Sequence, residues 1–291
     1  MVACERSAAS APVPGSTWQQ LDLLNREHVR SVVRTLRPSV VFHCAGFPHV
    51  AESWTDRIAP LESNVLATHY LLDALGRAAV PCRVLITGSA AVYAPSPRAL
   101  SETDPVTSDN PYALSKLAQE QLAIHAGRAQ GLDVVVTRSF NHTGPRQTPS
   151  FFAPSVARQV ARIEAGVQPP VIRVGNLDAR RDISDVRDVV DAYLALARLG
   201  RAGTVYNVGS GESHAMRSVL DILLGLSQVE VRVETDSERL RPSDTPDLFA
   251  DASRLREDTG WRPRISLQQC LADLLAYWRG VVRSDGARET R

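Results

Sequence analysis

The fold and the chemistry of this chain are decided by Val84-Leu85-Ile86-Thr87-Gly88-Ser89 together with Tyr112-Ala113-Leu114-Ser115-Lys116. The apolar run at 83–87 predicts a buried strand that ends in a Gly-Ser turn. Residues 110–130 predict a helix, because an Asn-Pro pair opens the segment. Tyr112 and Lys116 are four residues apart on this helix, so their side chains project from one face.

This spacing predicts an acid–base site. An ammonium close to a phenol favours the phenolate, so we expect the pKa of Tyr112 to fall below its usual value of about 10. Ser89, at the end of the strand, can hydrogen-bond a substrate carbonyl. Together Ser89, Tyr112 and Lys116 predict a site that interconverts a carbonyl and an alcohol. The alternative is a surface tyrosine and a solvated lysine that share a helix face by chance.

The composition argues against charged macromolecular partners. The 291 residues include 33 basic and 32 acidic side chains, so no strong field favours nucleic acid or an anionic membrane. We expect a cytoplasmic protein, because no apolar stretch spans a bilayer and residues 1–20 lack the pattern of a signal peptide. The four cysteines lack metal-ligand spacing, so we expect no metal and buried thiols in a reducing compartment: Cys4, Cys44, Cys82 and Cys270.

Apolar runs alternate with helix-like segments through the first two thirds of the chain. This alternation predicts an α/β fold with a doubly wound parallel sheet covered on both faces. We expect strands at 40–45, 83–87, 132–138 and 204–208, and helices at 25–36, 59–79, 110–130, 186–199 and 267–278. The polar tail after Gly280 is expected to fray.

In Ser89, Tyr112 and Lys116, and in the order of the segments around them, the chain resembles the extended short-chain dehydrogenase/reductase family. The resemblance implies a Rossmann-like NAD(P)-binding domain at 1–140 and 184–209. It also implies a smaller C-terminal α/β substrate domain at 141–183 and 210–280, and a flexible tail at 281–291. The cofactor would be NADP(H) or NAD(H), bound by Arg6, Asp22, Leu23, Cys44, Ala45, Gly46, Asn64, Tyr112, Lys116 and Phe140.

Two stretches, 138–147 and 173–186, resemble the group of GDP-mannose 4,6-dehydratases and GDP-4-keto-6-deoxy-mannose reductases. This resemblance implies a GDP-linked sugar substrate, bound by Ser89, Asn141, His142, Asn176, Arg181 and Arg241. Guanidinium groups suit phosphate oxygens, because they form paired hydrogen bonds with them. The alternative is that Arg180 and Arg181 form surface pairs with Asp178, Asp182 or Asp185.

One departure from the family's dehydratases bears on the reaction. In those enzymes acidic or polar residues, including a glutamate, follow the catalytic hydroxyl, whereas Ala90 and Ala91 follow Ser89 here. Elimination of water needs a base and an acid, and two methyl groups supply neither. We therefore expect reduction of a 4-keto-6-deoxy-hexose rather than dehydration. The alternatives are a nucleotide-sugar 4-epimerase and a catalytically impaired sugar-nucleotide-binding relative.

The family's first strand and its glycine-rich turn, which hold the cofactor pyrophosphate, find no counterpart in this sequence. Residues 1–7 resemble the end of the second strand instead, so we expect a sheet without its first strand and a native start upstream of Met1. If the chain does begin at Met1, residues 1–24 should be poorly ordered or pair beside 40–44.

The resemblance also implies a homodimer. Family members commonly pair through the helix that carries the Tyr and Lys and the long helix before it. Apolar surface for such an interface is expected from Leu66, Tyr70, Leu71, Leu114, Leu117, Gln121 and Leu122, unless these residues pack on the sheet.

Overall fold

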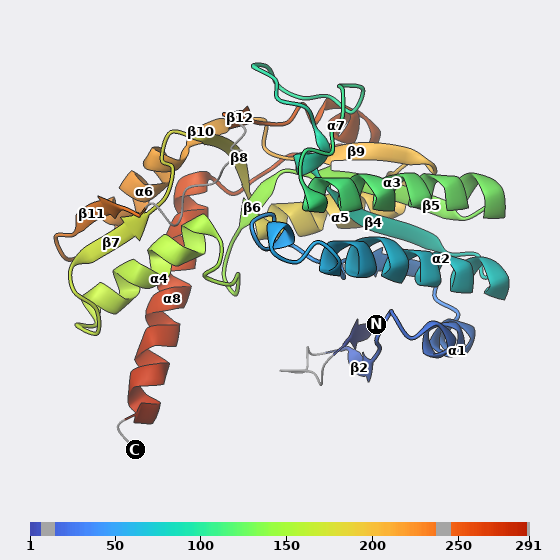
Figure 1. Cartoon of the computed structure of the whole chain (residues 1–291), viewed down its shortest axis with the longest axis horizontal. Helices are drawn as coiled ribbons and strands as arrows, with labels where there is room; N and C mark the ends of the chain where they lie inside the picture. Colours follow the sequence, from blue (N-terminus) through green and yellow to red (C-terminus); the bar gives the residue numbers. More distant parts are fainter. Residues whose placement is uncertain (7–14, 237–245, 290–291) are drawn as a thin grey trace. The chain divides into compact units, whose positions relative to one another are not determined.

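In a computed structural model of the chain, the apolar run at 83–87 forms β4 (Arg83–Ser89), an inner strand of a four-stranded sheet (Figure 1). The strand order is β3-β4-β5-β9, with β3 at Val40–His43, β5 at Asp133–Ser139 and β9 at Thr204–Val208. β3 and β4 run parallel, and Val84, Leu85 and Ile86 are fully buried. The predicted α/β fold is confirmed.

The structure describes residues 1–6, 15–236 and 246–289, with side chains as far as 285. The chain divides into two compact units. Unit 1 comprises Met1–Val92, Pro105–Arg138 and Leu196–Tyr206, and unit 2 comprises Tyr93–Asp104, Ser139–Ala195 and Asn207–Arg291. The assignment of a cofactor domain and a substrate domain stays a prediction.

In unit 1 the helices are α1 (Arg26–Leu36), α2 (Ala67–Ala78) and α3 (Pro111–Gln130), with a π-helical turn η2 (Leu61–Leu66) before α2. Figure 1 shows α2 and α3 side by side along the sheet. α3 begins where it was predicted to, because the Asn110 side chain accepts the N–H of Ala113 at 2.8 Å. The unit is held by a core that includes Val29, Leu72, Leu75, Val84, Ile86, Ala123 and Val134.

The N-terminal residues form a separate parallel pair, β1 (Val2–Glu5) with β2 (Thr17–Gln20). Among the described residues β3 pairs with β4 alone, and its side chains Val40 and Phe42 are 40% and 41% exposed. Of the two arrangements expected for 1–24, pairing beside 40–44 is therefore not found among the residues described. Residues 7–14 lie outside them.

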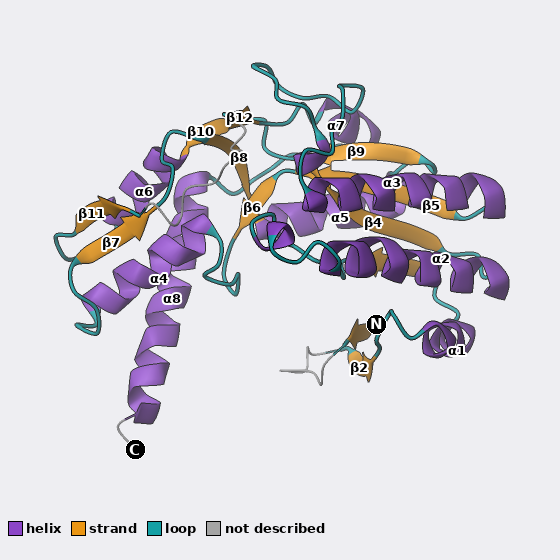
Figure 2. Ribbon diagram, viewed as in Figure 1, coloured by secondary structure: helices purple, strands orange, loops and turns teal. Residues whose placement is uncertain are grey.

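Unit 2 is built around β8 (Arg180–Asp185), which pairs with β6 (Asn141–Thr143), β10 (Ser213–Ala215) and β12 (Asp247–Leu248). A second pair joins β7 (Val171–Val174) to β11 (Arg232–Thr235) (Figure 2). Packed on the core of this unit are α4 (Phe152–Glu164), α6 (Met216–Gly225) and α8 (Leu267–Glu289). The remaining helices are α5 (Val186–Leu199), α7 (Ser253–Thr259) and two 3₁₀ turns, η1 (Glu52–Trp54) and η3 (Ala90–Val92).

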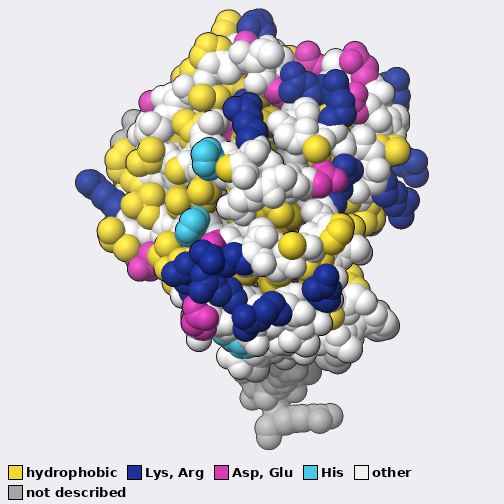
Figure 3. Space-filling view, turned by 90° about the vertical axis from the view of Figure 1, so that its right-hand side faces the viewer, with side chains coloured by type: hydrophobic (Ala, Val, Ile, Leu, Met, Phe, Trp, Pro, Cys, Tyr) yellow, Lys and Arg dark blue, Asp and Glu magenta, His cyan; other side chains and the backbone are white. Residues whose placement is uncertain are grey.

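α8 runs on past Gly280 to Glu289, and Val281 and Val282 continue its apolar face and pack on the core of unit 2. The flexible tail at 281–291 stays a prediction. No helix in the described part of the chain is both long and apolar enough to cross a membrane. Figure 3 shows one face of the molecule, where groups of arginine side chains lie with Asp and Glu near several of them.

Candidate functional site

The predicted acid–base residues come together in unit 1. α3 carries Tyr112 and Lys116, which are only 9% and 6% exposed, so neither is a solvated surface residue. Ser89 ends β4, and its side chain hydrogen-bonds Tyr112 and also accepts the N–H of Ala91 at 3.2 Å. β4 can place Ser89 there because Gly88 has no side chain: a Cβ on Gly88 would lie 2.2 Å from the Thr137 carbonyl oxygen.

The pKa of Tyr112 is raised, so the expectation that Lys116 lowers it is wrong. Burial of the phenol raises this pKa, and the hydrogen bond with Ser89 opposes the shift only in part. The ammonium of Lys116 instead donates to the Thr87 carbonyl oxygen and to Gln119 Oε1, each at 3.0 Å. At neutral pH Tyr112 is therefore protonated and suited to donate a proton.

Lys116 is the only lysine among the 33 basic residues of the sequence. Burial lowers its pKa from 10.5 to about 8. An arginine keeps its charge at any working pH and holds it on a broad planar group, whereas an ammonium is compact and responds to its surroundings. The chain thus uses lysine only at the position where the charge is buried beside the candidate proton donor.

The loop after β3 passes close to Lys116. Asn64, on η2, accepts the N–H of Phe47 at 2.9 Å and donates to Ser115 Oγ at 2.8 Å. A Cβ on Gly46 would lie 2.4 Å from Asn64 Oδ1 and 3.5 Å from Lys116 Nζ, so any side chain there would have to displace the Asn64 amide. The neighbouring Cys44 and Ala45 are exposed, which places them within reach of a ligand.

The exposure of Cys44 corrects the prediction of buried thiols. All four cysteines are free, and Cys4 and Cys44 are exposed whereas Cys82 and Cys270 are buried. No cluster of three or more His, Cys, Asp or Glu side chains able to hold a metal occurs within the described ranges.

The other predicted cofactor residues lie at strand ends. Arg6 follows β1 and is exposed, and its carbonyl oxygen accepts from Gln20 Nε2 at 3.0 Å. Asp22 follows β2, is exposed, and accepts the N–H of Leu24 at 2.9 Å, while Leu23 beside it is half-buried. Phe140 is buried within unit 2, where its ring stacks on Tyr93.

The predicted substrate residues that the structure describes belong, apart from Ser89, to unit 2. On β6, Asn141 is exposed and His142 is half-buried, with His142 Nδ1 3.1 Å from the Phe140 carbonyl oxygen. Burial lowers the pKa of His142. Asn176 is half-buried and accepts the N–H of Asp178 at 2.9 Å. Arg241 lies outside the described residues.

The two adjacent arginines do not follow the surface pairing considered as the alternative. Arg180 lies 3.5 Å from the carboxylate of Asp247 and donates to the Ser213 carbonyl oxygen at 2.7 Å, while Arg181 donates to the Arg180 carbonyl oxygen. Two of the three acidic candidates have partners of their own. Asp182 accepts backbone N–H groups of Ser210, Gly211 and Ala250, and Asp185 pairs with Arg187.

Gln119 belongs to this site although its residue type alone does not predict it. Gln119 is fully buried and accepts a hydrogen bond from Lys116. The signal was present, because residues three apart on a helix lie on one face. A glutamine carries no catalytic signature of its own, so this spacing by itself assigns it no role.

Comparison with known proteins places the chain among sugar-nucleotide enzymes. The sequence model of the GDP-mannose 4,6 dehydratase family matches residues 6–274. The GDP-6-deoxy-D-mannose reductase of Pseudomonas aeruginosa is 37% identical over 280 residues, which cover 95% of this chain and 90% of that protein.

Solved structures agree with this result. The structure of RMD from Pseudomonas aeruginosa complexed with NADPH superposes with a TM-score of 0.83 at 36% identity, covering 94% of this chain and 92% of that one. The UDP-glucose 4-epimerase of Thermus thermophilus in complex with NAD gives a TM-score of 0.86 at 26% identity, with 96% and 91% covered. The expected Rossmann-like fold is thereby confirmed.

Proposed function

Because the chain belongs to the GDP-mannose 4,6 dehydratase family of extended short-chain dehydrogenases/reductases, we propose that it reduces a nucleotide-linked 4-keto-6-deoxy-hexose with NAD(P)H. We propose GDP as the nucleotide, since a relative of 37% identity is a GDP-6-deoxy-D-mannose reductase. The observation that carries the proposal is a buried, protonated Tyr112 beside Ser89, with Ala90 and Ala91 where elimination would need an acid or a base.

Each residue of the site has a defined task in this reaction. Ser89 hydrogen-bonds the C4 carbonyl oxygen and so stabilises the negative charge that develops on it. Tyr112 donates its proton to that oxygen as the alcohol forms. Lys116, whose ammonium donates to the Thr87 carbonyl oxygen and to Gln119, would bind the nicotinamide ribose. A bound nicotinamide cofactor supplies the hydride.

The residues around Lys116 fit the nicotinamide half of such a cofactor. Two donors of the ammonium are engaged by Thr87 and Gln119, and the third remains for a ribose hydroxyl. Gly46 lets the exposed loop approach without a side chain in the way. We propose NADP(H), with the exposed Arg6 near the 2′-phosphate and Asp22 near the adenine.

For the sugar nucleotide we propose contacts from unit 2. Asn141, Arg181 and Arg241 would bind phosphate oxygens, which guanidinium geometry suits, and His142 and Asn176 would contact the rest of the substrate.

A 4-epimerase is the second candidate, favoured by the similarity to the Thermus thermophilus enzyme. Incubation with a GDP-4-keto-6-deoxy sugar and NADPH separates the two. A reductase consumes NADPH in proportion to the product it forms, whereas turnover without net consumption identifies an epimerase.

Tyr112→Phe removes the donated proton and should lower kcat by roughly a hundredfold or more. Tyr277→Phe, which alters a tyrosine of unit 2, is the matched control. Equal rates for these two variants would contradict the assigned role of Tyr112.

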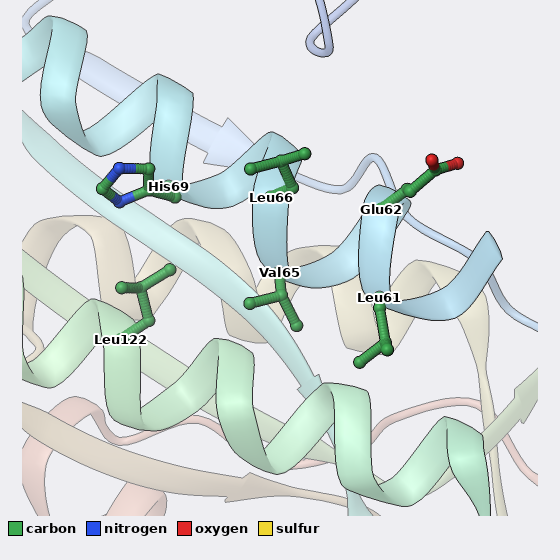
Figure 4. Close-up of a pocket in the computed structure, with 6 residues that line it drawn as sticks. All are labelled: Leu61, Glu62, Val65, Leu66, His69 and Leu122. Carbon is green, nitrogen blue, oxygen red and sulfur yellow. The ribbon is translucent and has the colours of Figure 1, made fainter. Parts of the chain in front are cut away.

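We further propose a cytoplasmic homodimer. Leu61, Leu66 and Leu114 are 39%, 38% and 47% exposed, and a hollow of about 360 Å³ between η2, α2 and α3 is lined largely by apolar side chains (Figure 4). Leu71, expected at this interface, is buried in the core of unit 1 instead. Leu66→Arg should convert a dimer into monomers in light scattering. A protein that is monomeric before the substitution would refute the interface.

A further inference from the structure

A chain of buried polar side chains leads away from Lys116 into unit 1. Lys116 Nζ donates to Gln119 Oε1 at 3.0 Å, and Gln119 Nε2 donates to Thr68 Oγ1 at 2.8 Å. The same hydroxyl lies 2.8 Å from His43 Nε2 and 2.6 Å from the Asn64 carbonyl oxygen. All of these side chains are almost completely buried.

The direction of each hydrogen bond follows from the inventory of protons. The Thr68 hydroxyl has one proton, which it donates to the Asn64 carbonyl oxygen. Its oxygen must therefore accept from both Gln119 and His43. His43 is then the neutral tautomer with its proton on Nε2, in agreement with a pKa that burial lowers to about 4.

This arrangement locks the Gln119 amide. Rotation of the amide by half a turn would place its oxygen against the Thr68 oxygen and its NH₂ group against the ammonium, so two hydrogen bonds would become two repulsions. Gln119 Oε1 is thus held facing Lys116. The titratable groups that face Lys116 are His43 and Cys44, on and after β3, and Tyr112 from its own helix. His43 is neutral, and partial desolvation by the surrounding protein raises the pKa of the Cys44 thiol although the residue reaches the surface, so neither supplies a negative charge at neutral pH.

We propose that Gln119, oriented by Thr68, is a positioning residue that holds the Lys116 ammonium in place and keeps it charged within the buried site. The inference rests on the proposed function only through the role of Lys116. It adds a requirement at a residue that touches neither substrate nor cofactor.

The test uses the single lysine of the chain. Protein grown with isotopically labelled lysine gives one side-chain resonance in the NMR spectrum, and its chemical shift against pH reports the pKa of Lys116 directly. Gln119→Leu removes one of the two acceptors, and the pKa should fall from about 8 by about one to two units. Gln119→Glu keeps the size and adds a negative charge, so the pKa should rise above that of the wild type.

The matched control is Gln130→Leu, the same change at an exposed position on the same helix, for which no shift is expected. A Gln119→Leu titration that superposes on the wild type, or a Gln130→Leu shift of equal size, would overturn the proposal. If Gln119→Leu fails to fold, Gln119→Glu decides: an unchanged or lowered pKa overturns it. The titration needs no substrate, so an inactive protein that shows the expected shifts contradicts the proposed function alone.

Discussion

The ion pair between Arg138 and Glu120 offers the sharpest test of what holds α3 in place. Arg138 Nε and Nη2 donate to the two carboxylate oxygens of Glu120 at 2.8 and 2.7 Å, and the side chains are 7% and 3% exposed. Arg138→Met leaves the Glu120 carboxylate buried without this guanidinium. The substitution removes two hydrogen bonds to charged groups, each contributing roughly 1.5–3 kcal/mol. This figure agrees with the usual cost of breaking a buried ion pair, so we expect the free energy of unfolding to fall by about 4 kcal/mol.

The assay is urea denaturation followed by circular dichroism, with the free energy of unfolding extrapolated to water. Arg77→Met is the matched control, because Arg77 is 63% exposed and its pair with Asp73 should contribute less than about 1 kcal/mol. The double variant Glu120→Leu with Arg138→Met should recover most of the loss, since it leaves no buried charge unpaired.

Two results would refute this reasoning. One is a loss for Arg138→Met no larger than that for Arg77→Met, which would mean that burial does not amplify the interaction. The other is a double variant whose loss of unfolding free energy equals the sum of the losses of Glu120→Leu and Arg138→Met. Such additivity would show that the side chains contribute by packing and not as an ion pair.

Three further predictions concern other parts of the site and its support. Gly46→Ala should weaken NADPH binding roughly tenfold in calorimetry, because the new methyl displaces Asn64. Gly225→Ala, which has open space around it, should leave the NADPH affinity unchanged. Equal NADPH affinities for the two variants would show that the loop at Gly46 does not depend on its close contact with Asn64. The folded-state pKa of His43, about 4, lies below its unfolded value of 6.5, so its contribution to stability is present above pH 6.5 and lost as the pH falls through 4. Urea denaturation of the wild type should therefore lose about 3 kcal/mol more than that of His43→Gln between neutral pH and pH 4, and identical losses would show that the histidine is not buried neutral. Asp182→Ala should cost at least about 3 kcal/mol in the same assay, because the N–H groups of Ser210, Gly211 and Ala250 lose their acceptor; a cost below about 1 kcal/mol would mean that water replaces the carboxylate.

The sequence alone determined the element pattern and the central residues of the site. The strand before Ser89 and the helix that carries Tyr112 and Lys116 are local features, because periodicity, a capping Asn-Pro pair and a four-residue spacing act within one segment. Ala90 and Ala91 were likewise sufficient to argue against dehydration, since elimination of water requires an acid and a base and alanine provides neither.

Tertiary structure decided the properties that depend on distant partners. The direction of the Tyr112 pKa shift, the continuation of α8 and the partner of Arg180 all went against local expectation or beyond it. The acceptor for Lys116 is Gln119, and that amide is oriented by Thr68, 51 residues away in the chain. Burial and hydrogen-bond direction depend on the residues that the fold brings into contact, so the spacing of residues within a single helix does not predict them.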